Sequence, residues 1–544
     1  MSFILQHNIM LISFIFRQIA FIPYNIPRLL PYTMGRYNSL VTCTIVSSVA
    51  LPAMCCWAFS HTSAAIVNTN TQSALRNSVK PFYYYYDDDD DIELFNAMQR
   101  SGVGYDVSSA RGWMEYIEQS EGPKYGVGAY TVIRCDASFV TLSSSSKATT
   151  SPTHDAKSFD CEWKIWGEQF HLDRLSLSFN TLTENLFGSS DQQQLGSFSY
   201  GSGISSLSGT GSSVHTQSLF EESKEETKHV IRKLFEQATR SIHAEMQQLA
   251  HKNKFSQSDS LLTQTLMLTI LWTPSKQFFG EAAVKPIVRG HAAFANEPHQ
   301  PTVDIDDELP IPITASVAIP KQLTAEALSV LPHRHGISLN RQRQVGVSAS
   351  AKLSSWCRIR RPLEDPNRSK PTGVSEVVLV RQKPDTNERG TNIMSYPDEN
   401  FINKLEFLEG LISNLFVVYK DGTVRTAPTG LVLPGYARHL IIQELNEREL
   451  RLDSTKPPTM QDMRSGLWSE VFVTSAIRLV IPVERIIMPA IGPNNANQPS
   501  ILWEAPNDDE IRFPVTKAIR SAMFHRGCSQ ATVQHLVLNE SNNI

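Results

Sequence analysis

Between residues 228 and 250, apolar side chains recur at the three- and four-residue spacing of an amphipathic α-helix. Polar residues fill the remaining positions, so one face of this helix should pack on a sheet while the other meets solvent. Two short apolar runs follow at 266–272 and 286–288, and both predict strands. The positions that define the helical face are Ile231, Leu234, Phe235, Ala238, Ile242, Met246 and Leu249.

This succession of elements predicts a mixed α/β (α+β) fold with two domains. We expect an N-terminal α/β domain over residues 105–340 and a C-terminal domain, richer in strands, over residues 345–530. Two stretches rich in Ser and Gly, at 138–153 and 188–213, cannot bury enough apolar surface to form a core of their own. We therefore interpret both stretches as insertions in the first domain.

The first 86 residues differ from the rest of the chain because they contain no Asp or Glu. Residues 40–59 form an apolar run behind Arg36, as in the core of a signal peptide, and a basic stretch rich in Ser, Thr and Asn follows, as in transit peptides. The two parts resemble the bipartite leaders of algal plastid proteins. We expect residues 1–86 to be a removable leader to the plastid, with the secretory pathway as the alternative.

Removal of the leader would leave no stable membrane association, whereas a membrane anchor is the other interpretation of its apolar runs. Residues 87–104 open with five consecutive aspartates and are expected to form an acidic linker, because adjacent carboxylates repel one another and stay solvated.

Composition excludes several classes of function. The chain of 544 residues has a formal net charge of −4, so it lacks the positive charge of a dedicated nucleic-acid-binding protein. Its seven cysteines are scattered and form no CxxC pair, which argues against a disulfide framework and a structural zinc site. No Walker-type loop and no dinucleotide-binding fingerprint is present. We expect neither a nucleic-acid partner nor a metal.

The most informative part of the sequence lies in the second domain. Residues 417–419 form an apolar strand that ends at Asp421-Gly422, a dipeptide typical of a hairpin turn. Farther along, a proline and Gly435 break the chain directly before a helix predicted over 436–445. A helix that starts behind a glycine offers backbone N–H groups and the positive end of its dipole, which suits a phosphate.

Three motifs in this region carry a resemblance to a known family. They are Glu409-Gly410 followed by Ser413-Asn414 and a hydrophobic strand, the helix start Pro434-Gly435-x-x-Arg438, and a later strand that ends with Thr474-Ser475-Ala476. Together they resemble the fold-type IV enzymes that depend on pyridoxal 5'-phosphate (PLP), namely branched-chain aminotransferases, D-amino-acid aminotransferases and aminodeoxychorismate lyases. The sequence is most similar to the plant and algal group described as D-amino-acid aminotransferase-like.

The resemblance implies a smaller N-terminal α/β domain, a larger strand-rich pseudo-barrel domain, and PLP in the cleft between them. Glu409 would face the pyridine nitrogen and keep it protonated, so that the ring can accept electrons from the substrate. The backbone N–H groups at the helix start would hold the phosphate together with the later turn. The remaining cofactor-binding positions implied in this way are Ser413, Asn414, Gly435, Tyr436, Ala437, Thr474, Ser475 and Ala476.

The family forms a Schiff base between PLP and a lysine, and Lys352 is our candidate. It precedes an arginine-rich helix and the predicted strand 375–380, which is the order found in the family. The interval from Lys352 to Glu409 is longer than usual in the family, and a polar insertion at 381–403 accounts for the excess. Lys370 is nearer to the strand, but no helix fits between the two.

Other positions are matched to the substrate pocket and the phosphate. Tyr130 lies in a segment similar to the family's first strand, whose aromatic residue lines the pocket, and Trp356 and Cys357 follow the candidate lysine. Arg174 belongs to a His-x-x-Arg-Leu motif that starts at His171, in which the arginine binds the phosphate with two hydrogen bonds.

Three positions depart from the family's pattern and leave the substrate open. Cys357 stands where branched-chain aminotransferases have a tyrosine, Ala476 stands where a hydroxyl is common, and Arg478 replaces a frequent glutamate.

The resemblance implies a PLP-dependent class IV aminotransferase that acts on a small amino-acid substrate and forms a homodimer. A 4-amino-4-deoxychorismate lyase, which supplies 4-aminobenzoate for folate synthesis, and a catalytically silent relative are the alternatives. From the residues alone, Lys352, Glu409 and Arg174 could each also be ordinary solvated side chains. The sequence leaves the substrate and its L or D configuration open.

Overall fold

The structure is a computed structural model in which about half of the chain is described in detail. The described residues are 82–85, 109–122, 125–141, 159–187, 214–251, 261–275, 285–295, 309–318, 351–364, 372–382, 402–448, 450–488, 500–506 and 512–538. Most of the expected leader, the acidic linker 87–104, the insertion 188–213 and most of the insertions 138–153 and 381–403 lie outside them. Within these ranges, no helix combines the length and the apolar character needed to cross a membrane.

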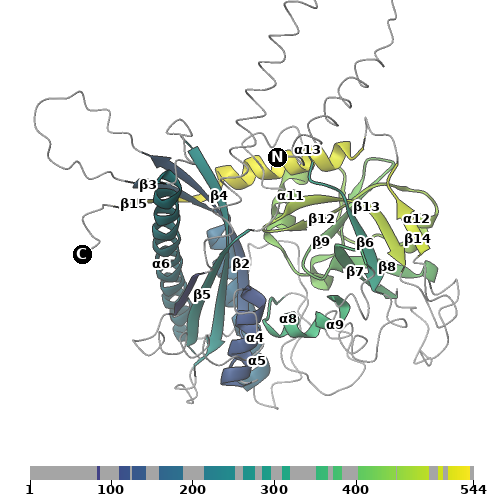
Figure 1. Ribbon diagram of the computed structural model, residues 1–544. Helices are drawn as coiled ribbons and strands as arrows, with labels where there is room; N and C mark the ends of the chain where they lie inside the picture. The colour runs from purple at the N-terminus through teal and green to yellow at the C-terminus, as the bar shows by residue number, and fades with distance from the viewer. Residues whose placement is uncertain are drawn as a thin grey trace, which may run out of the picture. The chain divides into compact units, whose positions relative to one another are not determined.

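A six-stranded antiparallel sheet forms the first layer of the molecule (Figure 1). The strands expected at 266–272 and 286–288 are confirmed as its neighbours β4 and β5, and both are longer than expected. In spatial order the strands are β1 (Phe82–Tyr85), β5 (Pro286–Phe294), β4 (Leu261–Pro274), β2 (Ala129–Thr141), β3 (Phe159–Ile165) and β15 (Thr532–Leu538).

Two helices, α5 (Glu168–Phe187) and α6 (Val214–His251), cover one face of this sheet (Figure 1). The helix expected over 228–250 is confirmed as part of α6, and its apolar face from Ile231 to Ile242 is buried against the strands. The ring of Phe235 stacks on Trp163 of β3 with the centroids 4.4 Å apart. Alternate residues of β2 point into this core, so the intervening ones, such as Tyr130, face the other side of the sheet.

The second layer is a closed barrel of six strands. The barrel closes because β9 pairs with both β8 and β12, and small strands extend it at the margins. Apolar side chains fill its interior, as expected for a barrel of this size. The barrel strands are β6 (Ile313–Ala318), β7 (Glu376–Gln382), β8 (Leu405–Gly410), β9 (Asn414–Tyr419), β12 (Trp468–Ser475) and β13 (Leu479–Met488). The marginal strands are β10 (Val424–Arg425), β11 (Leu452–Asp453) and β14 (Ser500–Glu504).

Helices α11 (Tyr436–Glu447) and α13 (Pro514–Ser529) pack on the outside of the barrel. Beneath them Phe416 of β9 stacks on Phe472 of β12, with the ring centroids 5.1 Å apart. The expected turn is confirmed, because Gly422 adopts a positive φ of 82° and joins β9 to β10. The helix expected over 436–445 is confirmed as α11.

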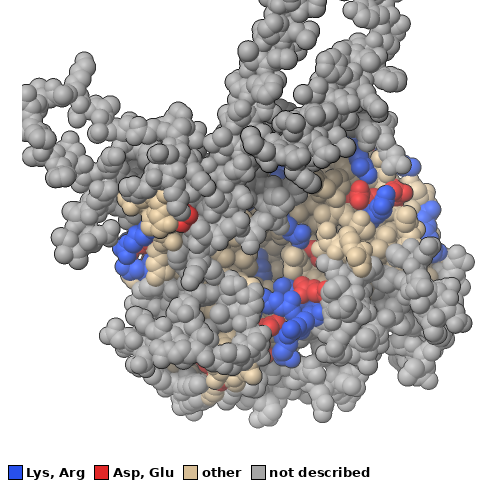
Figure 2. Space-filling model, viewed as in Figure 1, with Lys and Arg blue, Asp and Glu red and all other residues tan. Residues whose placement is uncertain are grey.

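Helix α4 and two short helices that follow Lys352 are joined by ion pairs. Arg358 binds Glu118 at 3.2 Å, and Arg111 binds Glu364. Figure 2 shows blue and red side chains interspersed in this region. The helices are α4 (Ala110–Glu121), α8 (Ser355–Ile359) and α9 (Arg361–Glu364), and the barrel also carries α12 (Met460–Arg464) and the 3-10 turn η3 (Thr429–Leu431).

The pairing of the strands differs from the expected division of the chain. β1 lies within the expected leader 1–86 but pairs with β5, and β2 continues to Thr141 through the start of the insertion 138–153. β6 lies in the range 105–340 but joins the barrel, where it pairs in parallel with β7 and β13. β15 lies beyond residue 530 and returns to the first sheet. The α/β class and the strand-rich C-terminal barrel are nevertheless confirmed.

Candidate active site

Helix α5 places Arg174 against the start of α11. The Arg174 guanidinium donates to the Pro434 carbonyl oxygen at 3.3 Å and to the Thr131 hydroxyl at 2.7 Å. Burial lowers its pKa to about 10, and among the described residues no carboxylate pairs with it. A buried cation without an acidic partner is costly unless a ligand supplies the anion. Arg174 is therefore suited to a phosphate and is not the exposed arginine of the alternative.

His171 orients this arginine. The Thr131 hydroxyl lies 2.7 Å from Nδ1 of His171, and the Arg174 guanidinium lies 3.1 Å from the same nitrogen. Burial, followed by the charges of Arg174 and Lys352, holds the pKa of His171 well below its ordinary value. The ring is thus neutral, and because Nδ1 accepts from the arginine, the ring proton is on Nε2.

The start of α11 meets the requirements of an anion site. Gly435 is its N-cap and provides no side-chain cap for the first N–H groups of the helix, at Tyr436 and Ala437, and Arg174 contacts the preceding residue Pro434. The Tyr436 ring packs on Phe170 and on His171, with the centroids 5.4 and 5.3 Å apart. The Tyr436 hydroxyl is buried and has no hydrogen-bond partner among the described residues, and the binding of a phosphate by the backbone of Tyr436 stays a prediction.

Asn414 and Glu409 lie beneath this helix start. The Asn414 amide donates to the Leu433 carbonyl oxygen at 2.8 Å, and a Cβ on Gly435 would lie 2.4 Å from Asn414 Oδ1. Glu409 is 2% exposed, and its Oε2 accepts the Leu433 N–H at 2.9 Å and the Asn414 amide at 3.4 Å. Glu409 is therefore a buried, oriented carboxylate, which contradicts the alternative of a solvated acid.

The turn between β12 and β13 brings in the third motif. Thr474 is buried, and within the described part of the chain its hydroxyl finds no partner. The Ser475 hydroxyl accepts the Arg478 N–H at 3.1 Å and so stabilises the turn, while Ala476 can offer only its backbone. Because Thr474 pairs with Asn414 across β12 and β9, its unsatisfied hydroxyl lies beside the helix-start motif. An orphaned hydroxyl in this position fits a phosphate oxygen.

Lys352 is fixed through its backbone by the first layer. Its N–H donates to the Ser178 hydroxyl of α5 at 3.0 Å, and its carbonyl accepts the Tyr130 N–H at 2.9 Å. Its Nζ lies 5.0 Å from the centroid of the Tyr130 ring. Ser178 follows Arg174 by one helical turn, so the same face of α5 positions both the lysine and the arginine.

Of the expected pocket residues, Tyr130 and Cys357 lie together. The Cys357 thiol lies 3.7 Å from the Tyr130 hydroxyl and donates to it. Trp356 has a different role, because its indole N–H donates to the Leu411 carbonyl oxygen at 3.0 Å and its ring packs against the barrel. The long arginine-rich helix expected after Lys352 is replaced by the short helices α8 and α9.

Two residues near the site were missed by the sequence analysis. Glu376 is buried and binds Ser413 Oγ at 2.8 Å, and Ser178 binds the backbone of Lys352. The signal for Glu376 was a charged residue directly before the apolar run 377–380, because such a residue must find partners when it is buried. Ser178 has no comparable signal.

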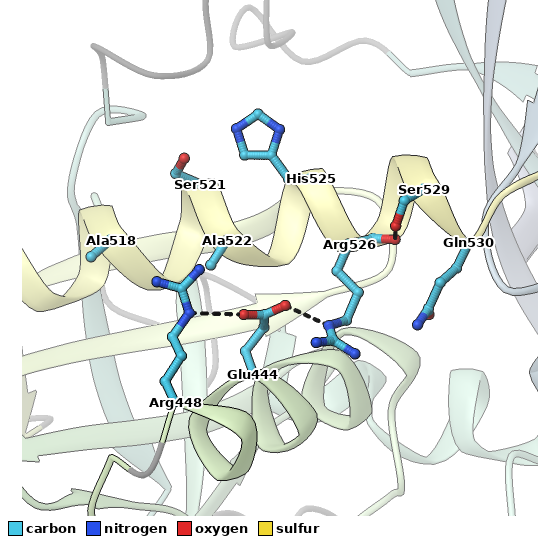
Figure 3. A pocket seen from close by; sticks show the side chains of 9 residues that line it. All are labelled: Glu444, Arg448, Ala518, Ser521, Ala522, His525, Arg526, Ser529 and Gln530. Atoms are coloured by element: carbon cyan, nitrogen blue, oxygen red, sulfur yellow. Dashed lines mark hydrogen bonds and ion pairs between the residues drawn. The ribbon is translucent and has the colours of Figure 1, made fainter.

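A separate surface groove lies between the C-terminal half of α11 and α13 (Figure 3). In it Glu444 lies between Arg448, at 3.0 Å, and Arg526. None of the residues matched to the family's motifs lines this groove. Among the described residues, no cluster of three or more metal-binding side chains is present.

Comparison with known proteins identifies the region that carries most of these residues. Residues 353–486 match the family model of amino-transferase class IV. No curated protein matches the chain. The matched segment begins one residue after Lys352 and includes Glu409, the start of α11 and the Thr474 turn.

Solved structures of branched-chain aminotransferases are similar to the chain at low identity. The Escherichia coli enzyme is 17% identical, covers 74% of this chain and 85% of its own, and gives a TM-score of 0.35. The T.th. enzyme with pyridoxamine 5'-phosphate is 14% identical, covers 79% and 91%, and gives 0.37. The enzyme from Thermoproteus uzoniensis with norvaline is 11% identical, covers 79% and 92%, and gives 0.36. On the evidence of the family model, the chain carries an aminotransferase class IV domain over residues 353–486.

Proposed function

We propose that the protein is a PLP-dependent aminotransferase that acts on an amino acid through a Schiff base at Lys352. One observation carries the proposal: Arg174 is buried without an acidic partner among the described residues, beside the uncapped start of α11. A positive site of this kind, closed to solvent and without a counter-ion from the described chain, is suited to a phosphate. The orphaned hydroxyl of Thr474 adds a third donor to the same place.

The other residues of the site would serve the ring of the cofactor and its Schiff base, at the end away from the phosphate. When bound, PLP supplies a ring that accepts electrons from the α-carbon of the substrate. Glu409 carries the negative charge that would keep the ring nitrogen protonated, and the hydrogen bonds from Leu433 and Asn414 fix its orientation. The amine of Lys352 is the group that would hold the cofactor and then move the α-proton of the substrate.

Tyr130 and Cys357 would form the wall of the substrate pocket next to this amine. The Tyr130 ring covers one side of Lys352 Nζ at 5.0 Å, which limits the access of water to it. The thiol of Cys357 donates to the Tyr130 hydroxyl and holds the ring in place.

The experiment uses the purified full-length protein, incubated with PLP, because β1 lies within the expected leader and pairs with β5. We expect the visible absorption band of a lysine-bound PLP, and borohydride reduction followed by peptide mapping should place the label on Lys352. Lys352→Ala should lose the band, whereas Lys420→Ala, which alters an exposed lysine in the turn after β9, should keep it. Labelling of another lysine, or a band that survives Lys352→Ala, would contradict the assignment.

The reaction is then identified by its co-substrate. An aminotransferase requires a keto acid as the acceptor of the amino group, so turnover should stop when the keto acid is omitted. Turnover of aminodeoxychorismate to 4-aminobenzoate without a keto acid would indicate the lyase. Bound PLP with no turnover of any amino donor would indicate a catalytically silent relative.

A further inference from the structure

Glu376, the first residue of β7, lies beneath both of the loops that carry the site. Its side chain is buried, with 3% exposure. One carboxylate oxygen, Oε1, accepts the Leu411 N–H at 3.2 Å. The other oxygen, Oε2, accepts the Ser413 hydroxyl at 2.8 Å and the Arg478 guanidinium at 3.3 Å. We propose that Glu376 is a positioning residue that ties the Glu409 loop to the Thr474 turn.

The first loop is shaped around this carboxylate. A Cβ added to Gly410 would lie 2.2 Å from Ser413 Oγ and 2.8 Å from the carboxyl carbon of Glu376. The chain can therefore approach Glu376 this closely only because residue 410 is a glycine. The Leu411 and Ser413 donors belong to the same tight loop between β8 and β9, so both ends of the loop are attached to one side chain.

The second loop reaches Glu376 through Arg478. Backbone contacts hold the turn itself: Arg134 donates to the Ile477 carbonyl oxygen at 2.7 Å, and Arg520 donates to the Val480 carbonyl oxygen at 2.6 Å. The Arg478 side chain is 15% exposed and extends from this turn to Glu376. Because the pair is largely removed from water, its loss affects both loops more strongly than the loss of a surface pair would.

This tie sets the distance between groups that act on opposite ends of the cofactor. Glu409 of β8 lies two residues before Leu411 of the first loop, and Thr474 lies two residues before the turn 476–478 that carries Arg478. Without the carboxylate, the two loops would be connected only through the pairing of β9 with β12, and a rigid ligand would lose affinity because more loop motion must be ordered when it binds. The part of the inference that concerns the ligand rests on the proposed function, whereas the coupling of the loops does not.

The test compares two buried ion pairs that each include a residue of β7. Glu376→Gln keeps the shape of the side chain and removes its charge. The matched control is Glu406→Gln, because Glu406 of β8 is also buried and pairs with Arg381 of β7 at 2.8 Å, away from both loops. Hydrogen–deuterium exchange of the cofactor-free protein is measured by mass spectrometry, and the dissociation constant of PLP is measured by equilibrium dialysis.

We expect Glu376→Gln to accelerate exchange in 411–414 and 475–478 together and to weaken PLP binding by about tenfold or more, whereas Glu406→Gln does neither. Arg478→Met should reproduce the effect without altering the buried carboxylate, and Arg478→Lys should restore part of the affinity for PLP. The double variant Glu376→Gln/Arg478→Met should bind PLP no more weakly than either single variant, because both substitutions remove the same contact.

Acceleration confined to one loop, or equal effects of Glu376→Gln and Glu406→Gln, would overturn the inference. Unchanged exchange in Arg478→Met would do so as well, and this variant decides the question if Glu376→Gln does not fold. If the wild-type protein binds no PLP, the proposed function fails, and the exchange of the two loops still decides whether Glu376 couples them.

Discussion

The sharpest prediction concerns Arg174, whose replacement should change the stability of the cofactor-free protein little while it weakens binding of the ligand strongly. The substitution is Arg174→Met, which keeps an unbranched side chain of similar length and removes the charge. The control is Arg289→Met, because Arg289 is equally buried but has an acidic partner in Glu121 of α4. The two variants therefore compare a buried cation without an acidic partner among the described residues, Arg174, with a buried cation that has one, Arg289.

The magnitude follows from the environment of each arginine. Burial lowers the pKa of Arg174 from 12.5 to about 10, which corresponds to an unfavourable free energy on the order of 3 kcal/mol for keeping the charge. Methionine removes this cost but also removes the hydrogen bonds to Pro434 and Thr131, which contribute about 1–3 kcal/mol together. The two effects nearly cancel, so the free energy of unfolding should change by less than about 2 kcal/mol. Arg289→Met leaves a carboxylate without its partner and should cost about 3–5 kcal/mol.

Binding should respond in the opposite order. Loss of the charge-assisted hydrogen bonds from Arg174 to the phosphate should cost about 3 kcal/mol, or roughly a hundredfold in the dissociation constant of PLP. Arg289→Met should leave this constant within a few-fold of the wild type, provided that the protein is kept folded at low temperature. Urea denaturation followed by tryptophan fluorescence gives the stability, and calorimetric titration gives the affinity. The reasoning is refuted if Arg174→Met unfolds as easily as Arg289→Met and still binds PLP normally.

Three other predictions follow from single contacts. Gly435→Ala should displace the start of α11, because its Cβ would lie 2.4 Å from Asn414 Oδ1, and should abolish PLP binding in a dialysis assay; Gly430→Ala, with nothing within 4 Å, should not. The free energy of unfolding of the wild-type protein should decrease as the pH falls below about 6.5. The reason is that burial lowers the pKa of His171, so that only the unfolded state takes up the proton. His171→Gln should flatten this dependence in urea titrations from pH 7.5 to about 5. Phe416→Ala should lower the free energy of unfolding by about 3–5 kcal/mol in the same assay, since the ring is fully buried.

Local patterns in the sequence predicted the elements that depend on local interactions. The apolar face around Leu234 predicted the part of α6 over 228–250, and the dipeptide Asp421-Gly422 predicted the hairpin after β9, in which Gly422 has a positive φ. Strand pairing between distant segments was not predictable in this way. The pairing of Val533 and its neighbours in β15 with β3 is set by which edge of the sheet is open, and no periodicity within residues 532–538 reports it.

The residues of the candidate site also fall into two groups, those that the sequence identified and those that it did not. Motif resemblance identified Glu409, Gly435 and Arg174, and the structure places all three around the start of α11. The residues that hold them were not identified, because their importance arises from contacts across the fold. Glu376 and Ser178 act through the backbone or hydroxyl groups of other segments, and a sequence offers no record of which segments meet.

The site is assembled from two layers, so ligand binding and the contact between the layers should be thermodynamically linked. Gly167, at the start of α5, has a φ of 62°, and a Cβ there would lie 2.2 Å from the ring of Tyr436 in α11. The same glycine is thus required for the close approach of α5 to α11 that brings Arg174 to Pro434. Because a phosphate would be held by groups from both layers, it would bind the docked arrangement only, and its binding free energy would add to the contact energy between the layers. A bound phosphate would supply the counter-ion that Arg174 does not have among the described residues, so part of the stabilisation of the docked layers would come from the ligand.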